Sequence, residues 1–145
     1  IPNYRYKVWL VRIALIYMIT FLILLFFSFI SSYLVIKIPV FAVTYNVLYP
    51  VFFLGVMAFM LSTVVKNGNG TAVLMIIFGL FFLILQEPLE TSKWNVFLNP
   101  FSVPDNISET AWSNIVRDNR IILLTAIIVF LLTGLFNLQK REKFI

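Results

Sequence analysis

The segment Thr71–Gln86, TAVLMIIFGLFFLILQ, decides the fold, because none of its side chains is charged and nearly all are apolar. Three more apolar runs occupy Trp9–Ile36, Val40–Val65 and Ile121–Leu138. In hydrocarbon a backbone must satisfy its own N–H and C=O groups, so we expect these runs to be helices. A helix needs roughly 20 residues to cross the apolar core of a bilayer. Thr71–Gln86 is shorter, so we expect it either to be extended at one end or to lie where protein rather than lipid covers its flanks.

The composition agrees with a membrane protein. Apolar residues make up 61% of the chain and charged residues 12%, whereas soluble domains are roughly 45–50% apolar. We therefore expect an all-α, polytopic helical bundle with four transmembrane helices, forming a single domain over residues 1–145 and surrounded by the lipid bilayer. The chain has no cysteine and no histidine. Disulfides and thiolate sites are thus excluded, and the commonest metal ligand is missing.

Charge predicts the orientation. With four helices, both termini and the turn at 66–70 should share one side of the membrane. That side carries Arg5, Lys7, Arg12, Lys66, Lys140, Arg141 and Lys143 against Glu142 alone. The other side carries Lys37, Lys93, Arg117 and Arg120 against Glu87, Glu90, Asp105, Glu109 and Asp118. The positive-inside rule therefore predicts cytoplasmic termini in a multi-pass protein of the plasma membrane, in bacteria the inner membrane. The net charge of +5 is better explained by this topology than by binding to nucleic acid.

Two features inside the helical pattern bear on motion and turns. Pro50 removes a backbone donor inside the second run, so we expect a kink there. Such a kink is either a hinge or a packing adjustment. The tight reversal between the second and third runs is formed by Lys66, Asn67, Gly68, Asn69 and Gly70. Asn and Gly tolerate positive φ, and Thr71 or Asn69 is expected to cap the next helix.

The outer segment at 87–119 is the one long polar stretch. Pro88, Pro100 and Pro104 interrupt it. A short re-entrant segment is predicted around Phe97, Asn99, Pro100 and Phe101, which place apolar groups beside a turn. The stretch Ala111–Val116 is expected to form a short helix lying at the membrane interface.

The sequence gives little support for proton-coupled transport or for catalysis. No Asp or Glu lies deep within an apolar run, although proton-coupled carriers normally need an ionisable relay there. The loop carboxylates show no paired spacing typical of a catalytic site. We therefore expect a path or a scaffold rather than an enzyme, with no catalytic, cofactor or metal site, and any energy supplied by a partner.

Three stretches carry a resemblance to a known family. FMLSTVVKNGNGTAVLMIIFGLFFLIL resembles the helix, short cytoplasmic turn and helix found late in ABC-2-type ABC transporter permeases. FLNPFS is similar to the re-entrant outer region of that family. LLTGLFNLQKREKF resembles its final helix and short basic tail. The order and spacing of these features, over nearly the whole chain, carry the resemblance.

The resemblance implies a function and partners. Such permeases typically have six membrane helices, so this chain would correspond to the last four, and it begins at Ile1 without a methionine. Two permease subunits, identical or different, would enclose an export path driven by two cytoplasmic ATPase subunits that bind ATP and magnesium. Contact with the ATPase is implied for Lys66, Asn67, Gly68, Asn69 and Gly70, and for Tyr4, Arg5, Tyr6 and Lys7. The alternative is an accessory or assembly subunit of a larger membrane complex, without transport of its own.

Overall fold

A computed structural model describes the backbone of residues 3–142 and the side chains of residues 7–140. Within this range the elements are all helices: α1 (Asn3–Leu34), α2 (Val40–Val65), α3 (Gly68–Gln86) and α4 (Glu109–Glu142). Each is long and apolar enough to cross a membrane. The all-α, four-helix bundle predicted from the sequence is therefore confirmed, and the protein is membrane-embedded.

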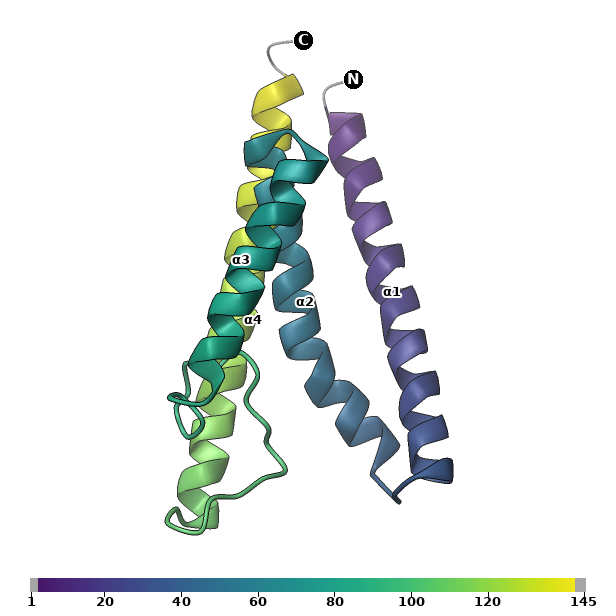
Figure 1. The fold of residues 1–145 in the computed structure, drawn as a ribbon. Helices are drawn as coiled ribbons and strands as arrows, with labels where there is room; N and C mark the ends of the chain where they lie inside the picture. Colours follow the sequence, from purple (N-terminus) through teal and green to yellow (C-terminus); the bar gives the residue numbers. More distant parts are fainter. Residues whose placement is uncertain (1–2, 143–145) are drawn as a thin grey trace.

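The helices run up and down, which gives the molecule two distinct ends (Figure 1). The start of α1, the α2–α3 reversal and the end of α4 lie together, and we call this the terminal end. The α1–α2 connection and the 87–108 loop between α3 and α4 lie at the opposite end, the loop end. The fold thus places the turn at 66–70 beside the start of α1 and the end of α4.

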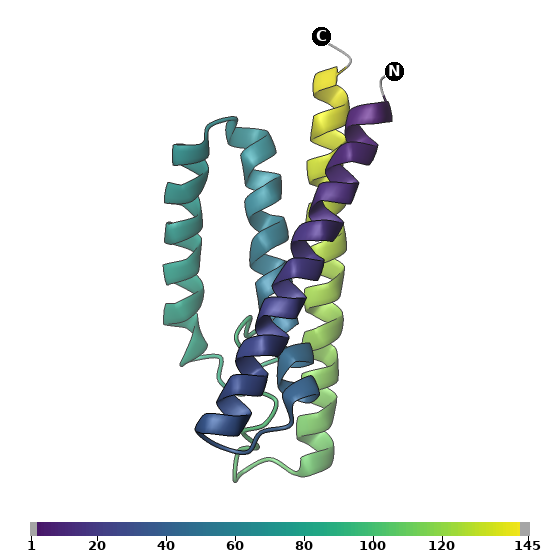
Figure 2. The same cartoon turned by 90° about the vertical axis from the view of Figure 1, so that its right-hand side faces the viewer.

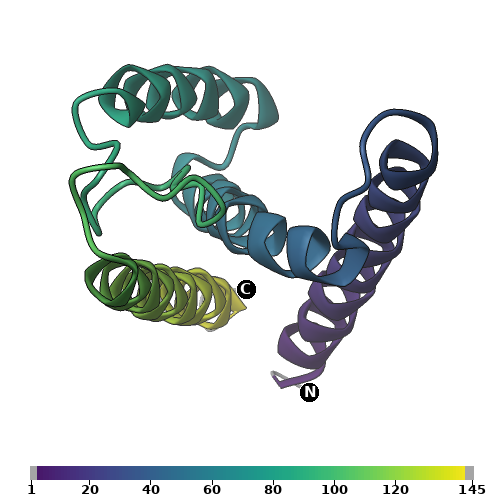
Figure 3. The same cartoon turned by 90° about the horizontal axis from the view of Figure 1, so that it is seen from below.

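Helix α2 is the centre of the bundle, since its backbone closely approaches those of the other three helices. The backbone of α3 closely approaches that of α2 alone among the helices. Viewed from the loop end, α1 and α3 lie on different sides of α2, and the 87–108 loop runs between α3 and α4 (Figure 3). Figure 2 shows α1 crossing in front of α4 at an angle. Much of the apolar surface of α1 and α3 is consequently left open to lipid or to other protein.

Aromatic side chains join α1 to α2. The rings of Tyr17 and Phe52 lie 4.2 Å apart between centroids, and those of Trp9 and Phe59 lie 5.8 Å apart. Near the loop end the hydroxyl of Thr44 lies within hydrogen-bond distance of that of Ser28, at 3.2 Å. In a membrane, contacts of this kind hold helices together by close packing and hydrogen bonds, because lipid is as apolar as the helix surfaces.

The core lies between α2, α4 and the 87–108 loop. Phe53, Leu123 and Val96 are buried against one another. The rings of Phe82 and Phe130 each lie 5.7 Å from that of Phe53. The core therefore fixes part of the loop against the two helices that form the site described below.

The α2–α3 reversal is shorter than predicted. Helix α2 spans Val40–Val65 as expected, and Lys66 ends it in the left-handed conformation, with φ 60°. The cap of α3 is Asn67 rather than Thr71 or Asn69, and its side chain accepts a hydrogen bond of 2.9 Å from the amide of Asn69. Gly68 to Gly70 are therefore the first turn of α3, which supplies the expected extension to about 28 Å at 1.5 Å per residue.

Helix α4 corrects the predicted boundaries. It begins at Glu109 instead of Ile121, and Ala111–Val116 belongs to it rather than forming a separate interfacial helix. Ser108 caps it, its hydroxyl accepting a hydrogen bond of 3.2 Å from the amide of Ala111. Hydropathy detects only the lipid-facing part of a helix, and no helix breaker separates the polar first turns from the apolar run. For the same reason α1 begins at Asn3, before the predicted Trp9.

The 87–108 loop contains turns and no helix. Asparagine side chains shape it: Asn95 accepts a hydrogen bond of 3.1 Å from the amide of Phe97, and Asn99 accepts one of 3.0 Å from the amide of Phe101. Such local bonds compete with helix formation, and the prolines lack backbone donors. The segment predicted to be re-entrant around Phe97–Phe101 therefore consists of successive turns.

Candidate functional site

A polar cluster is buried at the loop end, where α2, α4 and the 87–108 loop meet. Its centre is the guanidinium of Arg120 on α4, which donates a hydrogen bond of 3.1 Å to the side-chain oxygen of Asn46 on α2. A second bond of 3.1 Å goes to the side-chain oxygen of Asn119. The guanidinium carbon also lies 4.8 Å from the centre of the Tyr49 ring, a distance at which a cation is attracted to an aromatic face.

Arg120 is a buried cation. Its side chain belongs to a residue only 8% exposed, and its Nε atom is buried without a hydrogen-bond partner. Among the side chains of residues 7–140, the one ion pair is Arg117 with Asp118, which is solvent-facing and 3.6 Å long. The charge of Arg120 is thus balanced by amide oxygens and an aromatic ring, and by no carboxylate within that range.

Asn119 and Trp112 hold the loop to α4. The amide nitrogen of Asn119 donates to the carbonyls of Lys93 and Asn95, at 2.9 and 2.7 Å. The indole nitrogen of Trp112 donates to the carbonyl of Pro100 at 3.1 Å. Both side chains are almost completely buried. The polar first turns of α4 therefore serve as an anchor for the loop.

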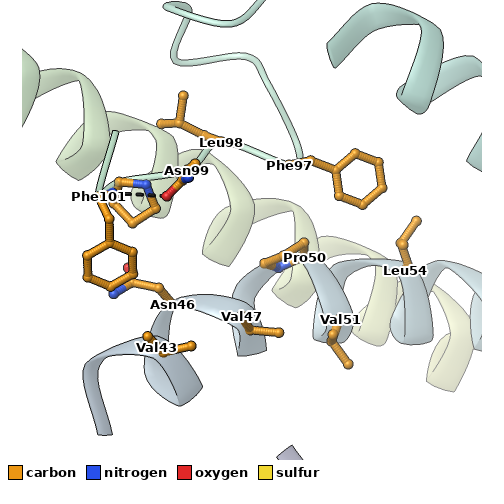
Figure 4. A pocket seen from close by; sticks show the side chains of 11 residues that line it. Val43, Asn46, Val47, Pro50, Val51, Leu54, Phe97, Leu98, Asn99 and Phe101 are labelled. Carbon is orange, nitrogen blue, oxygen red and sulfur yellow. Dashed lines mark hydrogen bonds between the residues drawn. The ribbon is translucent and has the colours of Figure 1, made fainter. Parts of the chain in front are cut away.

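Beside this cluster lies a groove of about 460 Å³ between α2 and the loop. Figure 4 shows its walls. The lining residues are Val43, Asn46, Val47, Pro50, Val51 and Leu54 from α2, and Phe97, Leu98, Asn99, Pro100 and Phe101 from the loop. The groove is a site of a size typical for small organic ligands, roughly 300–1,000 Å³.

The groove is more polar at one end than at the other. In Figure 4, Asn46, Asn99 and Phe101 lie toward one end, and Phe97, Val51 and Leu54 toward the other. Asn46 belongs to both the groove and the polar cluster, since it lines the groove and accepts a hydrogen bond from Arg120. Pro50 has no N–H to offer to the carbonyl of Asn46 four residues earlier, so a backbone acceptor is left at the same end.

The structure brings together two groups of residues that the sequence singled out separately. Pro50, the predicted hinge, and the predicted re-entrant residues Phe97, Asn99, Pro100 and Phe101 all line this groove. In Figure 1 the ribbon of α2 turns away from α3 and α4 in its loop-end part, the part that contains Pro50. A kink in α2 would therefore change the width of the groove.

The predicted coupling residues lie at the opposite end. Lys66, Asn67, Gly68 and Asn69 are exposed there, and Gly70 is half-buried. A Cβ added at Gly70 would lie 2.9 Å from the side chain of Val65. Tyr4, Arg5, Tyr6 and Lys7 lie in the first turns of α1 rather than in a loop. The side chains of Tyr4, Arg5 and Tyr6 lie outside the described residues, whereas Lys7 is exposed.

Sequence reasoning missed the residues at the centre of the cluster: Asn46, Tyr49, Asn119 and Arg120. The charge count treated Arg120 as one of the loop charges. The available signal was its position, because Asn119-Arg120 directly precedes the apolar run Ile121–Leu138. The guanidinium of an arginine at that boundary lies either at the membrane–water interface or against polar partners on a neighbouring helix.

No group of three or more His, Cys, Asp or Glu side chains that could hold a metal ion occurs among the residues that the structure describes. A comparison of the chain with known protein families, curated proteins and solved structures finds no match. Conclusions about function therefore depend on the chain itself.

Proposed function

We propose that this chain forms the membrane-spanning permease part of an ATP-driven exporter of the ABC-2 type, with ATP hydrolysis in a separate cytoplasmic subunit. The observation that carries the proposal is the order of elements: a helix, a tight reversal, a helix, a long polar loop and a last helix with a basic end. This is the order expected for the last part of such a permease. A second permease subunit, identical or different, would complete the path.

The charge distribution supports an orientation for this proposal. Lys7, Arg12, Lys66 and Lys140 belong to the terminal end, whereas most acidic residues belong to the loop end. Under the positive-inside rule the terminal end faces the cytoplasm of the plasma membrane. The α2–α3 reversal would then be accessible to a cytoplasmic ATPase.

Movement would pass from the reversal to the groove through α2. Lys66 and Asn67 are the exposed residues that join α2 to α3, so a push on them acts on both helices. Pro50 interrupts the hydrogen-bond ladder of α2 beside the groove. A bend at Pro50 would convert motion at the terminal end into opening or closing at the loop end.

One observation favours a second candidate, an accessory subunit of a larger membrane complex. Helix α1 exposes large apolar side chains along its whole membrane-spanning length, and α3 is nearly as open. Such surfaces are covered by lipid in either case, but they also offer room for further helices. An accessory subunit would use them for assembly and would need no nucleotide-binding partner.

Purification from the native membrane in mild detergent distinguishes the two. For an exporter we expect a stoichiometric co-purifying protein with a Walker-type nucleotide site, identified by mass spectrometry, and ATPase activity in the purified complex. A complex containing membrane subunits alone, with no nucleotide-binding protein after chemical crosslinking in intact membranes, would refute the exporter and support the accessory subunit.

A further inference from the structure

Arg12 on α1 is an exposed cation within an apolar run. It follows Trp9, the first residue of that run, by three positions, which is about 4.5 Å along the helix. Its side chain is exposed, and its guanidinium carbon lies 5.6 Å from the centre of the Trp9 ring. No carboxylate pairs with it among the side chains of residues 7–140, where the one ion pair is Arg117 with Asp118. Its charge is therefore available to the surroundings of the helix.

The face of α1 that continues from Arg12 toward the loop end is apolar and uncovered. The residues at helical spacing on this face are about half exposed or more: Leu15 48%, Ile16 59%, Ile19 51%, Ile23 50% and Phe26 61%. Side chains of a helix tilt toward its N-terminus, so that of Arg12 extends toward the terminal end, where Trp9 lies. The charge thus lies near the depth of lipid head groups, and the apolar side chains near that of acyl chains.

The terminal end offers almost no negative charge to balance Arg12. Its basic residues are opposed by Glu142 alone and are Arg5, Lys7, Arg12, Lys66, Lys140, Arg141 and Lys143. The end of α4, which lies near the start of α1 (Figures 1 and 2), is basic as well. A second copy inserted in the same orientation would bring the same basic end to this depth, so it would repel Arg12. An anionic lipid supplies the missing charge.

We propose that this face of α1 binds an anionic phospholipid, with the head group at Arg12 and Trp9 and an acyl chain along Leu15, Ile19 and Ile23. Arginine donates charge-assisted hydrogen bonds to phosphate oxygens. The preference is for the net charge of the head group. In phosphatidylcholine the choline cation cancels the charge of the phosphate, whereas phosphatidylglycerol carries no such cation. Lipid binding here is independent of the proposed transport function and of the orientation of the chain.

The experiment is native mass spectrometry of the purified chain in detergent, titrated with phosphatidylglycerol, phosphatidylcholine or diacylglycerol of identical acyl chains. Diacylglycerol has no phosphate and therefore measures the apolar contribution alone. We expect phosphatidylglycerol to bind about fivefold more tightly than either neutral lipid, as one basic residue at an anionic membrane surface implies. Arg12→Gln should abolish this preference. The matched control is Lys66→Gln, which removes one exposed positive charge from the same end, at the α2–α3 reversal, and should keep the preference.

The same measurements can overturn the proposal. Equal binding of phosphatidylglycerol and phosphatidylcholine by the unaltered chain would refute an anionic site. An equal loss of preference in Arg12→Gln and Lys66→Gln would show that the overall charge of the terminal end attracts the lipid and that Arg12 forms no site. Displacement of the lipid by millimolar inorganic phosphate would identify free phosphate as the ligand. If Arg12→Gln kept its lipid but lost a co-purifying membrane subunit, a carboxylate of that subunit would be the partner of Arg12 instead.

Discussion

Asn46 and Arg120, which are 74 residues apart in the sequence, are joined by a hydrogen bond of 3.1 Å that connects α2 to α4 at the loop end. A second guanidinium nitrogen of Arg120 donates a hydrogen bond to the side-chain oxygen of Asn119. The amide nitrogen of Asn119 in turn donates to two backbone carbonyls of the 87–108 loop. One chain of hydrogen bonds therefore connects two helices and the loop. Because these groups are buried, each depends on the others for its partners.

Removing the acceptor on α2 should destabilise the bundle. Asn46→Ala leaves a donor of Arg120 unsatisfied in a buried place, which costs about 1–3 kcal/mol. We expect a lower thermal unfolding midpoint in detergent, followed by tryptophan fluorescence. The control is Asn114→Ala, an exposed asparagine on α4, which should leave the midpoint unchanged. Equal midpoints for both variants would mean that the Asn46–Arg120 bond adds nothing to stability.

Removing the anchor on α4 should release the loop while preserving the helices. Asn119→Leu keeps the branched shape and the number of heavy atoms of the side chain but loses the bonds to the carbonyls of Lys93 and Asn95. Hydrogen–deuterium exchange of a peptide covering 92–98 should become faster, and that of α3 should stay the same. Ser113→Ala, at an exposed position of α4, is the control. Unaltered exchange over 92–98 would show that the core contacts of Val96 suffice to hold the loop.

Two helix glycines should respond oppositely to a methyl group. A Cβ at Gly134 would lie 2.5 Å from the ring of Phe59, which also contacts Trp9, whereas a Cβ at Gly79 would meet nothing within 4 Å. Alanine is the better helix former by about 1 kcal/mol. We therefore expect Gly79→Ala to be neutral or stabilising and Gly134→Ala to be destabilising by about 1–3 kcal/mol, measured as unfolding midpoints. A midpoint for Gly134→Ala as high as that of Gly79→Ala would contradict close packing of α2 on α4.

Cysteine labelling should determine the orientation, since the chain has no cysteine of its own. Asn69→Cys and Ser102→Cys introduce single thiols at exposed positions of the terminal and loop ends. In intact cells a membrane-impermeant maleimide should label Ser102→Cys alone, and lysis should make Asn69→Cys reactive. Labelling of Asn69→Cys in intact cells would reverse the orientation inferred from charge.

The α2–α3 reversal should be sensitive to a change in charge if an ATPase binds there. Asn69 is more suitable than Asn67, because Asn67 is the cap of α3 and its replacement would weaken the helix. Asn69→Glu places an acid in the first turn, where the helix dipole favours it by about 0.3–1 kcal/mol. We expect the protein to insert normally but to lose transport coupled to ATP hydrolysis in vesicles.

Ser102→Glu, at the loop end, is the control for that experiment and should keep its coupling. Normal coupling in Asn69→Glu would remove the reason to assign the reversal to the ATPase surface, even if the two proteins co-purify.

The membrane spans were predictable because lipid imposes one strong requirement on every residue that it contacts. Helix α2 has the predicted bounds, Val40–Val65, since Pro39 precedes it and a polar turn follows it. The first turns of α4 were not predictable by the same rule. They are largely polar, and their buried residues Trp112 and Asn119 lie against the loop.

The candidate site was predicted as separate parts. Pro50 and the Phe97–Phe101 turns were recognised from local chemistry, but their meeting in one groove depends on how α2 and the loop pack. The pairing of Asn46 with Arg120 depends on tertiary structure in the same way. A single asparagine within an apolar run has many local partners, and nothing in its neighbours identifies an arginine on another helix.

The central position of α2 also has a consequence for synthesis. Its main neighbour in the bundle is α4, which leaves the ribosome after the other three helices. The amide nitrogen of Asn46 does not depend on α4, because it donates to the carbonyl of Ala42 on its own helix at 2.8 Å. The side-chain oxygen of Asn46 accepts its hydrogen bond from Arg120 on α4. Helices α1 to α3 can therefore enter the membrane one after another with this amide nitrogen already bonded, and the arrival of α4 supplies the donor for the amide oxygen and closes the loop end.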